Sequence, residues 1–167
     1  NDVILNNQNY GISVTGASSP VIQGNDINGT HFAPLNVSPS CGSVSSIYQP
    51  IGGGTGIALR NANYPVILWN IIENNSTRIN NGNNSNTGAG ISITGTQSVE
   101  IENNIIRDNA SNYDAAIAGT ISDMVLGKFY LVQTLIYDNS GLDGKTTQQV
   151  YISGTSSAGG APALIET

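Results

Sequence analysis

The chain has 167 residues, a formal net charge of −6 and only 10% charged residues. One domain accounts for this length, and the 38% hydrophobic content is low for a compact globule but too high for a disordered chain. Five basic residues against eleven acidic ones argue against a nucleic-acid partner, because binding to phosphates needs a positive surface.

Other classes are excluded by the cysteine count and by the apolar runs. Cys41 is the only cysteine, so neither an internal disulfide framework nor a cysteine-based zinc site is expected. The longest apolar runs, such as residues 65–69, fall far short of the roughly 20 residues of a membrane-spanning helix, and we expect no membrane insertion. The first residues resemble neither an initiator segment nor an export signal, which suggests a mature, excised or partial chain.

An internal repeat organises the chain. Residues 3–7 predict the tail of one copy, and three fuller copies follow, each opening on Gly-Ile and closing on Asn. The opening glycine and the closing asparagine are 14 positions apart in every copy, in the pairs Gly11 and Asn25, Gly56 and Asn70, and Gly90 and Asn104. A weaker copy closes at 135–139, and a fifth begins at Val150. The chain is therefore expected to begin and end in mid-repeat.

Each copy predicts short strands, because apolar residues alternate with small polar ones and no helical period is present. Such strands, joined by bends, are typical of a parallel β-solenoid whose coils stack about 4.8 Å apart. Equivalent positions should then form ladders. The expected aliphatic ladders are Ile12, Ile57, Ile91 and Val150; Ile22, Ile67, Ile101 and Leu131; and Ile4, Ile27, Ile72, Ile106, Ile136 and Ile165.

Two polar columns accompany these ladders. We expect a structural amide ladder at a tight bend, with Thr30 as the exception, formed by Asn7, Asn75, Asn109 and Asn139. The neighbouring column is Glu73, Arg107, Tyr137 and Glu166, in which Glu73 and Arg107 predict an ion pair between coils.

The Gly-Ile-x-[Val/Leu/Ile] openings and the Asn-x-Ile or Asn-Ile-Ile closings resemble the right-handed parallel β-helix repeat family, the fold of pectate lyases, polygalacturonases, phage tailspikes and surface or periplasmic β-helix proteins. The resemblance implies an all-β fold, a right-handed parallel β-helix of about five coils within one domain, 1–167. It identifies a scaffold and leaves the function open.

Insertions of variable length follow the third strand of each coil, at about 28–55, 73–89, 107–115 and 137–148. The two longest, 28–55 and 73–89, predict inserted loops. Loops from one corner of a solenoid stack on one side, so we expect a loop-bearing face that contacts partners.

Candidate binding residues are few. Trp69, Tyr64 and Tyr48 are candidates for stacking on sugar rings, against the alternative that they only pack. Asp108 and Asp138 share a column near Asn74 and predict a calcium site, against the alternative of a solvated corner of turn residues. Candidate glycosylation sequons begin at Asn28, Asn36, Asn74, Asn75, Asn83 and Asn109.

The preferred hypothesis is a non-catalytic extracellular or cell-surface protein, acting as a stalk, adhesive or filament segment. Its partners would be polysaccharide or other surface proteins, with end-to-end or lateral self-association, and calcium is the one cofactor considered. One alternative is a portion of a polysaccharide lyase, glycoside hydrolase or epimerase, whose characteristic Asp, His and Arg or Lys motifs have no match here. A second alternative is a periplasmic β-helix accessory protein.

Overall fold

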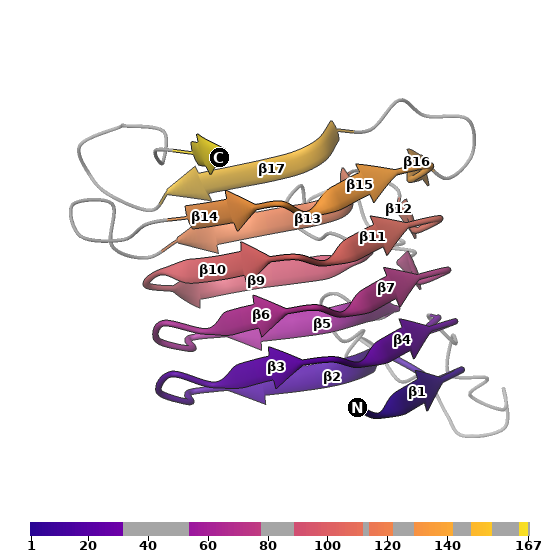
Figure 1. Ribbon diagram of the computed structural model, residues 1–167, viewed down its shortest axis with the longest axis horizontal. Coiled ribbons are helices and arrows are strands. Elements are labelled where there is room, and N and C mark those ends of the chain that lie inside the picture. Colours follow the sequence, from indigo (N-terminus) through magenta and orange to yellow (C-terminus); the bar gives the residue numbers. More distant parts are fainter. Residues whose placement is uncertain are drawn as a thin grey trace, which may run out of the picture.

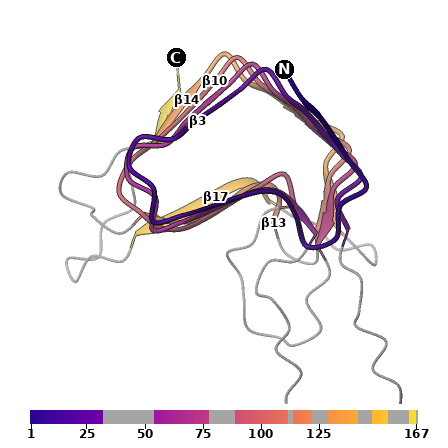
Figure 2. The ribbon, with the colours of Figure 1, turned by 90° about the horizontal axis from the view of Figure 1, so that it is seen from below.

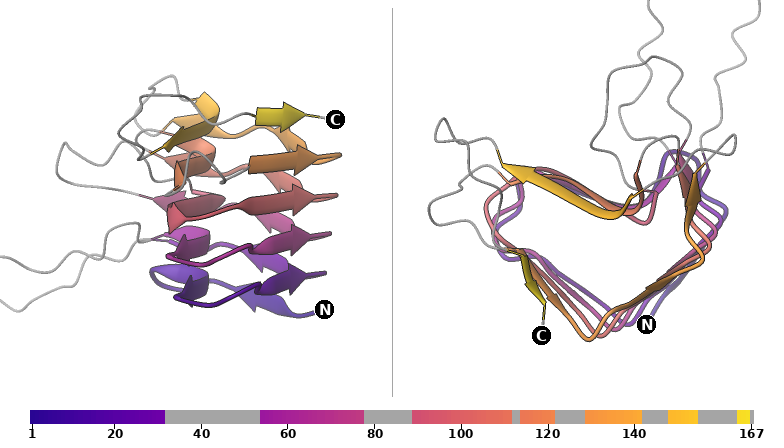
Figure 3. Two further views of the ribbon diagram at one scale, coloured as in Figure 1. Left: turned by 90° about the vertical axis from the view of Figure 1, so that its left-hand side faces the viewer. Right: turned by 90° about the horizontal axis from the view of Figure 1, so that it is seen from above.

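The computed structural model describes residues 1–31, 54–77, 89–111, 114–121, 129–141, 148–154 and 164–166. Within them the chain forms a parallel β-helix, in which each coil lies on the one before it (Figure 1). Seen along the axis, the coils superimpose in a three-sided outline (Figures 2 and 3). In this described part of the chain, no helix is long and apolar enough to cross a membrane.

Among the residues that the structure describes, the strands form three five-stranded sheets and one short sheet, and every strand pairing is parallel. The first sheet contains β2 (Tyr10–Thr15), β5 (Thr55–Arg60), β9 (Ile91–Thr96), β13 (Asp114–Ile121) and β17 (Gln148–Gly154). The second contains β3 (Val21–Gln23), β6 (Val66–Leu68), β10 (Val99–Glu102), β14 (Phe129–Val132) and β18 (Leu164–Glu166). The third contains β1 (Val3–Leu5), β4 (Asp26–Asn28), β7 (Ile71–Glu73), β11 (Ile105–Arg107) and β15 (Leu135–Tyr137). The short sheet contains β8 (Ser76–Thr77), β12 (Ala110–Ser111) and β16 (Ser140–Gly141).

Aliphatic ladders fill the space between the sheets, as the period-two pattern predicts. The central isoleucines of each sheet are fully buried and stand in register with one another, among them Ile57 and Ile91, Ile67 and Ile101, and Ile72 and Ile106. Ile117 also belongs to the ladder of the first sheet, between Ile91 and Val150. The sequence pattern did not predict it, because Ile117 is not preceded by a glycine.

The position expected for Ile165 is wrong. β18 pairs with β14, so Ile165 lies opposite Tyr130 in the second sheet and not beside Ile136 in the third. Glu166 likewise lies opposite Leu131 and is not in the column of Glu73 and Arg107. The last strand therefore belongs one sheet earlier in the coil than the repeat predicts.

The glycine of each Gly-Ile opening is required by close packing. A Cβ on Gly56 would lie 2.9 Å from Ile72 Cγ2 and 2.9 Å from Asn75 Nδ2. Side chains do not tolerate such distances in a close-packed interior. The opening glycine thus lets the first sheet approach the isoleucine ladder of the third sheet and the amide ladder. The Gly-Ile motif of the sequence therefore reflects this close packing.

The predicted insertions are partly strand. β4 continues to Asn28, and β8 lies within the predicted loop 73–89. An additional insertion lies elsewhere: two residues separate Thr96 from Val99, whereas seven separate their partners Ile121 and Phe129. The expectation of a single loop-bearing corner is therefore incomplete. Residues 32–53, 78–88 and 122–128 lie outside the described residues.

Candidate functional site

A buried amide ladder runs through the corner between the third sheet and the short sheet. The backbone N–H and Nδ2 of Asn75 donate to Asn109 Oδ1, at 3.1 and 2.9 Å. Asn109 donates in the same way to Asn139 Oδ1, at 3.0 and 2.9 Å. Thr30 donates its backbone N–H to Asn75 Oδ1 at 3.0 Å, and Asn7 lies in the same column in the first coil. Each amide thus satisfies the backbone of the coil beside it, which a buried turn requires.

A second amide ladder, which the sequence analysis did not predict, turns the chain between the second and third sheets. Asn70 donates its backbone N–H and Nδ2 to Asn104 Oδ1, at 2.9 and 3.0 Å. Asn25 donates to Asn70 Oδ1 at 2.9 and 3.1 Å, and Thr134 ends the column by accepting from Asn104. The constant spacing between the opening glycine and the closing asparagine was the signal for this ladder.

The residue before each ladder position has a positive φ. Asn74, Asp108 and Asp138 have φ values of 54°, 54° and 53°. Asn and Asp tolerate this left-handed conformation better than most other residues, so their place here follows from the turn. The Asp108 and Asp138 side chains are exposed on neighbouring coils, and Asp108 Oδ2 lies 3.7 Å from Arg107 Nε. Among the described residues, no group of three His, Cys, Asp or Glu is placed to hold a metal, and calcium stays a prediction.

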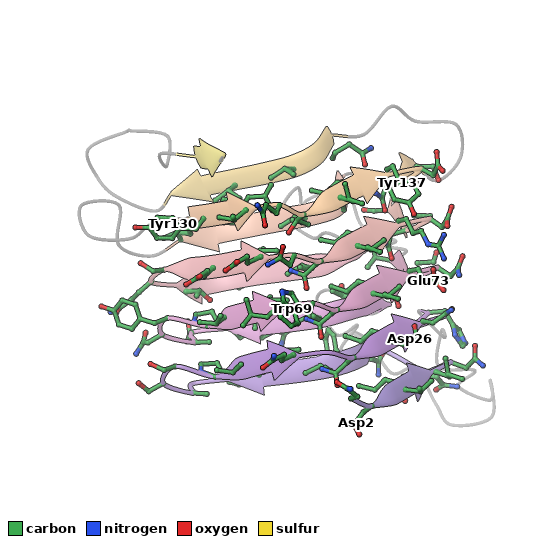
Figure 4. All side chains as sticks on the ribbon, viewed as in Figure 1. Asp2, Asp26, Trp69, Glu73, Tyr130 and Tyr137 are labelled. Carbon is green, nitrogen blue, oxygen red and sulfur yellow. The ribbon has the colours of Figure 1, made fainter. Side chains whose placement is uncertain are left out.

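The charged column, together with Asn28, joins four coils on the outer face of the third sheet. Asn28 Nδ2 donates to Glu73 Oε1 at 2.7 Å, and Arg107 Nε donates to Glu73 Oε2 at 2.6 Å. Arg107 also donates to the Tyr137 hydroxyl at 3.4 Å. The hydrogen bond to Glu73 raises the pKa of the Arg107 guanidinium further above its usual value. The predicted ion pair is therefore present; Figure 4 labels Glu73 and Tyr137 on this face.

The family described as "Right handed beta helix region" matches residues 1–158. The chain belongs to the right-handed β-helix family. No curated protein and no solved structure matches it.

Two of the predicted aromatic residues, Tyr64 and Trp69, lie apart on this β-helix. Tyr64 precedes β6 and is 54% exposed, whereas Trp69 follows β6 and is 62% exposed. Trp69 stands at the ridge between the second and third sheets (Figure 4). The two side chains therefore sit at opposite ends of one strand, and Tyr48 lies outside the described residues.

The structure separates the sequons into different groups. Asn75 and Asn109 are fully buried, and both donate Nδ2 within the amide ladder, so neither can carry a glycan in this fold. Asn28 is partly buried and donates Nδ2 to Glu73, whereas Asn74 is exposed. Asn36 and Asn83 lie outside the described residues.

An unpredicted contact crosses the outer face of the first sheet. Arg60 lies 5.2 Å from the centroid of the Tyr10 ring, and its guanidinium donates to the Tyr10 hydroxyl. Tyr10 pairs with Thr55, at the opposite end of β5 from Arg60, so the Arg60 side chain must run back along the strand. Small residues at the same level of the face, Ala58 and Ser92, leave room for it. Burial raises the pKa of the Tyr10 hydroxyl, and the nearby Arg60 charge partly offsets the effect.

Proposed function

We propose that this β-helix is a non-catalytic scaffold, a stalk, adhesive or filament segment of an extracellular or cell-surface protein. Its loop-bearing face would contact polysaccharide or neighbouring proteins. The observation that carries the proposal is that polar side chains at equivalent positions bond to one another from coil to coil.

The hydrogen bonds that Glu73 accepts support the proposal of a non-catalytic scaffold. A general acid or base has to reach the proton that it transfers, in a geometry open to substrate. Both Glu73 carboxylate oxygens already accept hydrogen bonds, Oε1 from Asn28 and Oε2 from Arg107. The same pairing occupies Arg107, a basic residue that a lyase-type mechanism would need as a free base. These groups hold neighbouring coils together and are not poised for chemistry.

The two aspartates support the same conclusion. Asp108 and Asp138 occupy turn positions with positive φ, where short polar side chains are favoured for conformational reasons. The turn conformation alone explains why aspartate stands at these two positions, and no catalytic role is needed to explain it. An extracellular or cell-surface location of the protein is supported by its low content of charged residues and by the exposed sequon at Asn74.

The test is an assay for turnover. The purified chain is incubated with polygalacturonate, alginate and neutral polysaccharides, in calcium and in chelator, while unsaturated products and new reducing ends are measured. We expect no product. Product release that disappears in Asp108→Asn, Asp138→Asn or Arg107→Gln would contradict the proposal, because it would place these side chains in a catalytic centre.

The exposure of the sequons has its own test. Expression through a eukaryotic secretory pathway, followed by intact mass measurement, should show glycan on Asn74 and none on Asn75 or Asn109. The variant Asn74→Gln identifies the site, since it also keeps Asn75 in place. A glycan found on Asn109 in the folded protein would contradict the buried ladder.

A further inference from the structure

A groove on the outer face of the second sheet lies apart from the columns described above. Its volume is about 320 Å³, and Pro65, Val66 and Val99 line it, of which Pro65 and Val99 are buried and Val66 is partly exposed. Tyr64 and Tyr130 line it as well, together with the Glu100 carboxylate. Figure 4 labels Tyr130 near the start of β14.

The register explains how three coils build this groove. Glu100 pairs with Val66 on one side and with Tyr130 on the other, so all three side chains point outward at one level. Tyr64 lies two residues before Val66, in the turn that leads into β6. The two tyrosines thus come from coils on either side of the coil that holds Glu100, and these two coils are about 10 Å apart at a coil spacing of about 4.8 Å.

We propose that this groove binds a neutral glycan, with a pyranose ring on a tyrosine face and sugar hydroxyls donating to Glu100. Aromatic rings with a polar edge suit a ligand that has both an apolar C–H face and hydroxyl groups. An ionised carboxylate only accepts hydrogen bonds, so the ligand must supply the donors. A mostly apolar groove with one charged acceptor also has the make-up of a small-ligand site.

Charge decides between neutral and acidic glycans. A polyuronate would bring carboxylates toward Glu100 on a chain whose net charge is −6. In the described part of the protein, the Glu100 carboxylate has no hydrogen-bond or ion-pair partner that would screen its charge. A neutral sugar avoids this repulsion and satisfies the carboxylate.

A compact cation is the competing ligand, because two tyrosines and a carboxylate also attract ammonium groups. Size favours the glycan. The groove is larger than an ammonium head group, and the tyrosines flank it from separate coils instead of enclosing one point. An open groove of this kind matches an extended chain of sugar rings.

This inference deepens the proposed function, because it names a ligand class for one face of the scaffold. The experiment is isothermal titration of the whole chain with cellohexaose, xylohexaose and mannohexaose, and with hexagalacturonate and choline for comparison. Turnover is measured separately by product release, so that catalysis, which would contradict the scaffold, is distinguished from a failure of this groove.

The variants are chosen to keep the fold. Tyr130→Thr suits a strand, Tyr64→Asn suits a residue with a φ of 52°, and Glu100→Gln keeps the side-chain shape. The matched controls are Glu102→Gln, which changes the next outward carboxylate on β10, and Trp69→Asn, which removes an exposed aromatic outside the groove at a residue with a φ of 51°. Melting temperatures verify that each variant folds.

We expect at least one neutral hexasaccharide to bind more tightly than hexagalacturonate. Either tyrosine substitution should weaken that binding about tenfold or more and Glu100→Gln severalfold, while the controls stay within about twofold, as expected when one or two groups carry most of the binding energy. The inference is overturned if no neutral probe binds, if hexagalacturonate or choline binds more tightly, or if the controls weaken binding as much as the groove variants.

Discussion

The amide ladder and the charged column cross the same coils only two residues apart, and they differ in environment. Asn75 and Asn109 are fully buried, whereas Glu73 and Arg107 lie on the outer face with 13% and 40% of their side-chain surface exposed. Their hydrogen bonds cover similar ranges of length, from 2.9 to 3.3 Å for Asn75 and Asn109 and from 2.6 to 3.4 Å for Glu73 and Arg107. Water can replace a broken hydrogen bond on the outer face but not in the interior. Loss of a hydrogen bond of similar length should therefore lower the free energy of unfolding more in the amide ladder than in the charged column.

The largest effect is expected from Asn109→Ala. The change removes four side-chain hydrogen bonds, two donated by Asn75 and two donated by Asn109 to Ile72 O and Asn139 Oδ1. Because the groups left behind are buried, we expect a loss of about 3 to 5 kcal/mol of unfolding free energy in denaturant titrations. Asn103→Gly is the control; it changes an asparagine of the same coil with a φ of 54° and should cost less than about 1 kcal/mol. Equal losses would contradict the comparison.

Gly90→Ala tests the close packing beside the ladder. A Cβ at Gly90 would lie 2.7 Å from Ala116 O and 2.9 Å from Ile106 Cγ2. Overpacking of this kind costs about 1 to 3 kcal/mol, measurable by thermal or denaturant unfolding. Gly16→Asn is the control, because Gly16 has open space around its Cβ position and a φ of 66° that Asn tolerates. A stable Gly90→Ala protein would show that the sheets can separate.

Tyr10 offers a test that depends on pH. Burial raises the pKa of its hydroxyl in the folded protein, so at high pH the unfolded chain loses that proton first. Stability from this group is complete below the ordinary tyrosine pKa of about 10 and is lost as pH rises above it. Melting temperatures should therefore fall more steeply above about pH 10 in the wild type than in Tyr10→Phe. Parallel curves would contradict the assigned burial.

The smallest effect is expected from Glu73→Gln. This substitution removes the charge and leaves a single acceptor oxygen, so only one of the hydrogen bonds from Asn28 and Arg107 is kept. The loss of stability should be well below that of Asn109→Ala. It should shrink further at about 1 M salt, where the Debye length is about 3 Å. A loss as large as that of the buried ladder, unchanged by salt, would show that solvent exposure does not separate the two columns.

The sequence predicted the parts of the fold that have constant spacing. Ile57, Ile91 and their equivalents follow from the period-two pattern, and the amide column follows from equivalent turns. Ile165 was misplaced because the length of the connection before the last strand does not repeat, so spacing no longer specifies the register. Where connections vary in length, the sheet to which a strand belongs depends on pairing that the pattern does not contain.

Contacts between side chains of different coils were harder to predict. The pairing of Arg60 with Tyr10 depends on Arg60 running along a strand past Ala58, which no motif encodes. Glu100 and Tyr130 become neighbours only through the register of β10 and β14. The connections that precede these two strands differ in length, so spacing in the sequence does not reveal the pair. None of these residues belongs to a recognisable sequence motif, and each becomes a candidate only through its neighbours in the folded protein.

The buried polar residues of the amide ladders join neighbouring coils. Hydrogen exchange of the Asn75 backbone N–H, which donates to Asn109 Oδ1, tests this role most directly. We predict slow exchange in the wild type and, in Asn109→Ala, a larger acceleration at Asn75 than at Asn70, whose N–H donates to Asn104. Exchange of the Asn75 N–H near the rate of an unfolded chain in the wild type would contradict the account.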